Sequence, residues 1–68
     1  MIPEERVQRA RQVVRSLRRE EGRRFAAEYL LFRLEGGLPP PPISGGQAIR
    51  RRLDAILDSP HSEALNSG

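Results

Sequence analysis

Residues 3–37 read PEERVQRARQVVRSLRREEGRRFAAEYLLFRLEGG, and this stretch decides the fold. Pro3 suits the first position of a helix, where its missing N–H costs nothing. Glu4 and Glu5 follow at the positive end of the helix dipole, which favours acids. Apolar residues then recur three and four positions apart, the spacing that marks one face of a helix: Val7, Ala10, Val14 and Leu17. The pattern predicts a helix that begins at about residue 3.

Gly22 raises the question of a break within this helix. A helix ending there would place two Glu at a negative C-terminus and open the next helix with two Arg at a positive N-terminus, so both ends would oppose the dipole. Gly inside a helix costs only about 1 kcal/mol relative to Ala. We therefore predict one continuous helix over about residues 3–35.

The second half of such a helix carries apolar residues on two faces. One aromatic stripe continues the apolar face of the first half, and a set of Ala and Leu residues falls on the opposite side. Ordinary core packing is the simplest interpretation of the aromatic stripe. One folded-back helix can cover only one face, so a second chain is expected to cover the other. The apolar candidates for partner binding are Phe25, Tyr29, Leu30, Leu31, Phe32 and Leu34.

The long helix is expected to stop at Gly36 and Gly37, because glycine adopts the left-handed conformation that ends many helices. Leu38 is then expected to fold back near Phe32. The four prolines at 39–42 favour a stiff polyproline II segment that acts as a hinge.

A second helix is predicted over about residues 46–58. Ser44 and Gln47 match a capping box, and the apolar residues that follow are spaced on one face: Ile49, Leu53, Ile56 and Leu57. Asp54 is placed to pair with Arg50 or Arg51. The Tyr29 hydroxyl is expected to reach solvent or a backbone group.

The predicted fold class is all-α. We expect a helical hairpin formed by residues 1–58, with a long helix over about 3–35, a Pro/Gly hinge over 36–45, a short helix over about 46–58 and a polar tail over 59–68. A chain of 68 residues without Cys has a small core and no disulfides. We therefore expect dimerisation, or docking on a partner, to complete the fold.

The composition argues against catalysis. All 12 basic residues are Arg, so mechanisms that need Lys are excluded, and His61 is the only His. The acids are scattered along helix surfaces, and two short helices enclose no sizeable pocket. We predict no enzymatic activity, cofactor, metal site or small-molecule substrate. No apolar run approaches the roughly 18 residues of a membrane span, so we expect a soluble, cytoplasmic protein.

The strongest functional signal is a row of Arg spaced four apart on the long helix, with one further Arg beside it: Arg11, Arg15, Arg18, Arg19 and Arg23. Like charges at this spacing destabilise a helix slightly, so the row is either a solvated face or is neutralised by a partner. The preferred hypothesis is a non-catalytic protein–protein interaction module, such as a regulatory subunit, adaptor or inhibitor, that uses its apolar faces and this row. The alternative is a nucleic-acid-binding accessory protein in which the row contacts phosphates.

Overall fold

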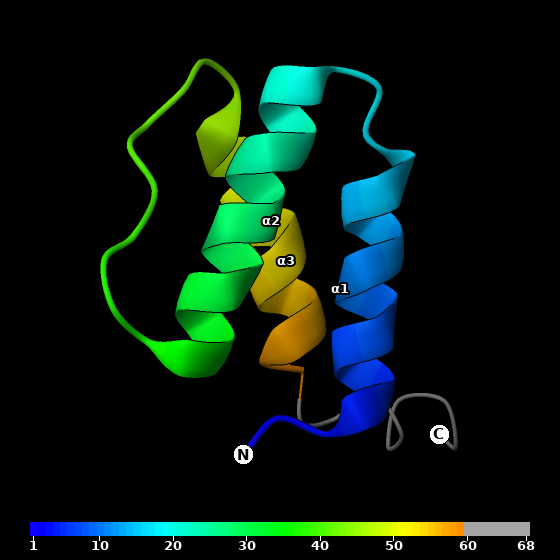
Figure 1. The fold of residues 1–68 in the computed structure, drawn as a ribbon. Helices are drawn as coiled ribbons and strands as arrows, with labels where there is room; N and C mark the ends of the chain where they lie inside the picture. The colour runs from blue at the N-terminus through cyan, green and yellow to red at the C-terminus, as the bar shows by residue number, and fades with distance from the viewer. Residues whose placement is uncertain (60–68) are drawn as a thin grey trace.

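The structure is a computed structural model that describes residues 1–59. Over those residues the chain is all-helical, as predicted, with three helices: α1 (Glu4–Ser16), α2 (Glu20–Glu35) and α3 (Gly46–Leu57). Figure 1 shows α1 and α2 side by side and running in opposite directions, with α3 packed behind them. Each helix contacts both others. The arrangement is a three-helix bundle, and the predicted tail lies outside the described residues except for Ser59.

The predicted continuous helix over residues 3–35 is wrong, because the chain turns back at residues 17–19. Leu17 and Arg19 are extended, with φ −70° and ψ 136° at the first and φ −83° and ψ 134° at the second. This break places Glu20 and Glu21 in the first turn of α2, where the helix dipole favours acids. The dipole argument excludes a break at Gly22 but favours one at residues 17–19.

The Arg23 side chain holds the turn between α1 and α2. Its Nη1 donates to the carbonyl oxygens of Leu17 and Arg18, each at 2.7 Å. These carbonyls follow the C-terminus of α1, where backbone acceptors have no helical partner. With the turn in place, α1 lies against the other two helices and buries Val7 and Ala10.

The core lies between the three helices. Leu53 and Leu57 come from the face predicted for the second helix, and both are almost fully buried. Full burial of a Leu side chain contributes about 1.5–3 kcal/mol. Gly22 is buried where α2 faces α3, and a Cβ built there would make an ordinary contact with Cδ1 of Ile49 at 3.5 Å. The buried cluster consists of Ala10, Ala26, Tyr29, Leu30, Leu53 and Leu57.

Helix α2 ends at the predicted glycines. Gly36 has φ 85° and Gly37 has φ 92°, and the Gly36 N–H donates to the Phe32 carbonyl at 2.8 Å. The linker then runs back along the outside of α2 (Figure 1). Leu38 is 91% exposed, so its expected contact with Phe32 is wrong. Prolines 39, 40 and 42 line the same hollow as Phe32 instead.

The start of α3 differs from the predicted capping box. Its N-cap is Gly45, with φ 78°, and no side chain caps the helix, so the assignment of Ser44 and Gln47 is wrong. The Gly46 N–H donates to the Ile43 carbonyl at 3.0 Å and closes a turn. This turn needs a left-handed residue, which glycine supplies without steric cost.

Candidate protein-binding surface

A shallow groove runs between α1 and α2 on the face away from α3. Its volume is about 260 Å³, and it is lined by Arg11, Val14, Arg15, Ala27, Leu30, Leu31 and Leu34. The turn at residues 17–19 creates the groove, because it places the two helices antiparallel and adjacent. Apolar and basic residues that the sequence separates by 12 or more positions therefore line one surface.

The floor of the groove includes exposed leucines. Leu31 is 53% exposed and Leu34 is 36% exposed, and Ala27 is exposed beside them on α2. These three residues are four and three positions apart, so they form one straight line on the helix. We call Ala27, Leu31 and Leu34 the leucine strip.

The α1 side of the groove is basic. Arg11 and Arg15 are both exposed, and among residues 1–59 neither forms an ion pair. One turn separates them on α1, so their charges reinforce each other along the groove. We call Arg11 and Arg15 the basic edge.

The other side of the leucine strip is acidic. Glu21, Glu28 and Glu35 are exposed on α2 and follow one another at intervals of seven, which places them on one side of the helix. Glu21 lies 3.4 Å from Arg19, whereas Glu28 and Glu35 form no ion pair within residues 1–59. Glu28 also lines a depression with Pro40 and Pro41 of the linker. We call Glu21, Glu28 and Glu35 the acidic row.

Three of the predicted apolar binding residues are instead core residues. Phe25, Tyr29 and Leu30 are 4%, 3% and 6% exposed, because α3 and the folded-back α1 cover the faces on which they lie. Phe32 is half-buried and packs against the core. Of the six candidates, Leu31 and Leu34 are exposed.

The predicted Arg row is divided. Arg11 and Arg15 lie on α1, Arg18 and Arg19 lie in the turn, and Arg23 is half-buried under the turn that it caps. Arg19 is exposed and lies near Glu21. The five residues therefore form no single ridge, since the ridge depended on the continuous helix.

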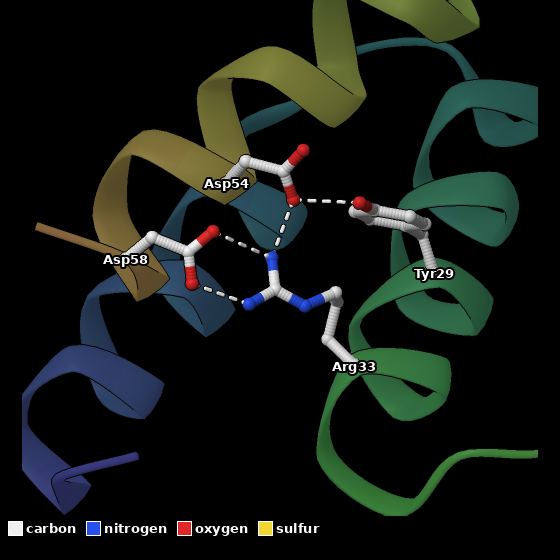
Figure 2. Close-up of polar contacts among 4 residues, drawn as sticks. All are labelled: Tyr29, Arg33, Asp54 and Asp58. Carbon is white, nitrogen blue, oxygen red and sulfur yellow. Dashed lines mark hydrogen bonds and ion pairs between the residues drawn. The ribbon is translucent and has the colours of Figure 1, made fainter.

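A polar network that the sequence did not predict joins α2 to α3 (Figure 2). Nη1 of Arg33 donates to Oδ1 of Asp54 at 2.6 Å and to Oδ2 of Asp58 at 3.1 Å, and Nη2 donates to Oδ1 of Asp58. Tyr29 donates its hydroxyl to Oδ1 of Asp54 at 2.6 Å. The hydrogen bonds that Arg33 donates to Asp58 and to Asp54 raise the pKa of Arg33 above its ordinary value. Arg33 thus joins α2 to α3 through two carboxylates.

The network corrects two expectations. Asp54 pairs with Arg33 rather than with Arg50 or Arg51, and the Tyr29 hydroxyl bonds a carboxylate rather than solvent or backbone. Arg50 lies over the Tyr29 ring, with its guanidinium carbon 5.1 Å from the ring centroid. A signal was present in the sequence, because two donors and two acceptors are each four residues apart on their helices, as Tyr29 with Arg33 and Asp54 with Asp58.

Within residues 1–59, no group of three or more His, Cys, Asp or Glu side chains could hold a metal ion. Among the same residues, no helix has both the length and the apolar character that crossing a membrane requires. His61 lies outside the described residues. No protein-family model, curated protein or solved structure matches this chain.

Proposed function

We propose that the protein is a small non-catalytic interaction module, such as a regulatory subunit, adaptor or inhibitor, that binds a polypeptide in the groove between α1 and α2. The observation that carries the proposal is the exposure of Leu31 at 53% in a helix whose other large apolar residues are mostly buried. A partner that covered the leucine strip would remove this apolar area from water, at about 25 cal/mol for each Å².

The residues around the strip suit a protein partner. Arg is enriched in protein interfaces, because its apolar stem packs while its guanidinium binds carboxylates. Arg11 and Arg15 line the groove beside its leucines. A groove between two antiparallel helices accepts the apolar face of a third helix. The groove therefore favours a helical partner with acids next to its apolar residues.

The nucleic-acid alternative has less support. Binding to a phosphate backbone requires several cations along one surface. Arg23 donates to two backbone carbonyls, and Arg19 lies near Glu21. The predicted row is thereby reduced to Arg11, Arg15 and Arg18, and two of these line an apolar groove.

The test replaces Leu31 with a photoreactive benzoylphenylalanine and irradiates cells of the native host that express this variant. A polypeptide seated in the groove should crosslink at position 31 and be identified by mass spectrometry. The matched control carries the same group at Arg52, which is exposed on α3. Crosslinking from position 31 alone supports the proposal.

A second variant, Leu31→Glu, tests the same surface without a new reactive group. A carboxylate there should prevent association while the helical circular dichroism stays unchanged, because the side chain is exposed. Equal crosslinking at positions 31 and 52, or no crosslinking at either, would contradict the proposed function. Association that survives Leu31→Glu would contradict it as well.

A further inference from the structure

We propose that the polypeptide in this groove is a second copy of the same chain, related by a two-fold axis parallel to α2. The inference rests on the proposed function, since it names the partner of the same surface. The observation behind it is the order of charges across that surface. The leucine strip has the acidic row on one side and the basic edge on the other.

Such a surface is complementary to itself. A closed homodimer uses the same patch on both copies, so each element of the patch must face an element that it can bind. A two-fold axis parallel to α2 brings one leucine strip onto the other. The same rotation places the basic edge of each copy over the acidic row of its partner, and both sets of charges are thereby matched.

The other simple arrangement is electrostatically unfavourable. A two-fold axis across α2, within the interface, would also join the leucine strips. It would place Arg11 and Arg15 of one copy against the same residues of the other, and the acidic rows against each other. Like charges in direct opposition cost association energy. The charge order therefore selects the parallel arrangement.

The spacing along α2 agrees with a parallel helix pair. Residues 20, 24, 27, 31 and 34 are all exposed, and their alternating intervals of four and three are those of a coiled-coil seam. Leu31 and Leu34 supply the apolar end of this seam. Arg24 would face its own copy near the axis and weaken the pair, so Arg24→Leu should tighten the dimer.

The experiment measures solution mass by light scattering over a concentration series. The wild-type chain should reach twice its monomer mass of 7.7 kDa. Two charge-reversed chains are then prepared, one with Arg11→Glu and Arg15→Glu and the other with Glu28→Arg and Glu35→Arg. Each chain should be monomeric alone, because the two sides of its leucine strip now carry charges of the same sign.

Mixing the two reversed chains is the decisive step. In the mixed dimer, the residues beside the leucine strip are acidic in one chain and basic in the other. Opposite charges therefore face each other on both sides of the strip, and a heterodimer should form. Mass spectrometry of native complexes distinguishes it from either homodimer. If a reversed chain loses its helical circular dichroism, the neutral pair Arg11→Gln and Arg15→Gln replaces it and should weaken the wild-type dimer by about tenfold.

Three results would overturn the inference: a wild-type monomer at every concentration, a dimer that persists in Leu31→Glu, or reversed chains that stay monomeric when mixed. A monomer that crosslinks from position 31 to a different protein would overturn the inference alone and leave the proposed function in place. Failure of crosslinking at position 31 to any protein would remove both.

Discussion

Single residues fix how the three helices meet. The side chain of Arg33 is 22% exposed, and its guanidinium donates hydrogen bonds to two carboxylates on α3. Arg23 bonds two carbonyls that follow α1. Both arginines use their hydrogen bonds inside the protein, whereas Arg11 and Arg15 form no ion pair within the described residues. Position in the fold, rather than residue type, separates structural from exposed arginines here.

Arg33→Met should destabilise the protein by about 1–2 kcal/mol, because it removes charged hydrogen bonds that are partly shielded from water. The loss corresponds to a decrease in melting temperature of about 4–16 °C for a domain of this size. Thermal circular dichroism measures it. The control Arg52→Met changes an exposed residue on α3 and should leave the melting temperature nearly unchanged. Equal effects of the two substitutions would contradict a structural role for the network.

Two buried glycines should respond to Ala in opposite ways. A Cβ at Gly22 would lie 3.5 Å from Ile49, an ordinary contact, whereas a Cβ at Gly46 would lie 3.0 Å from Phe25 and 3.1 Å from Ile43. Gly22→Ala should stabilise the protein by about 0.5–1 kcal/mol through helix propensity. Gly46→Ala should destabilise it by about 1–3 kcal/mol through overpacking. Urea unfolding of both variants checks the signs.

At the scale of elements, the break between α1 and α2 creates the groove and decides which residues line it. A continuous helix would carry the basic residues away from the leucines, but the turn at residues 17–19 brings α1 back beside α2. The turn also gives α2 its own N-terminus, with two acids in the first turn. The acidic row and the basic edge thus lie on opposite sides of one strip.

Proline substitution distinguishes the break from a continuous helix. Glu20 is the first residue of α2, and the preceding Arg19 is extended, which is the conformation that a following proline requires. Glu20→Pro should therefore change the free energy of unfolding by less than about 0.5 kcal/mol. Glu28→Pro, in the middle of α2, should cost about 3 kcal/mol or more. A large loss of stability from Glu20→Pro would contradict the break.

The molecule as a whole is a small bundle whose helices expose large apolar residues in one groove. Of the large hydrophobic residues that are exposed in the described chain, Leu31 and Leu34 lie in this groove, whereas Met1 and Leu38 lie outside the helices. The helices bury a modest core, as expected for a chain of 68 residues. Association through the groove would therefore add noticeably to stability.

Dimerisation should make the melting temperature depend on concentration. A partner that binds only the folded state stabilises it by mass action, so a hundredfold increase in wild-type concentration should raise the melting temperature by about 5 °C. Leu31→Glu should melt at one temperature throughout the series. Differential scanning calorimetry compares the two chains. A wild-type melting temperature independent of concentration would argue against self-association.

The sequence by itself determined the local features of this protein. The spacing of Ile49, Leu53, Ile56 and Leu57 predicted the face of α3 that packs against the core. Gly36 and Gly37 predicted the end of α2. These predictions succeed because helix periodicity and the left-handed conformation depend on residues within one or two turns of each other.

Only the tertiary structure decided which faces are covered. The acids at 20 and 21 are a local signal for the break at residues 17–19, but the break also depends on the bonds that Arg23 donates and on the burial of α1 against α2 and α3. That folding back buries Leu30 and leaves Leu31 exposed, although both belong to the same apolar run. The packing of α3 on α2 sets Arg33 opposite Asp54. Contacts between distant residues follow from how helices pack, and packing is a property of the whole chain.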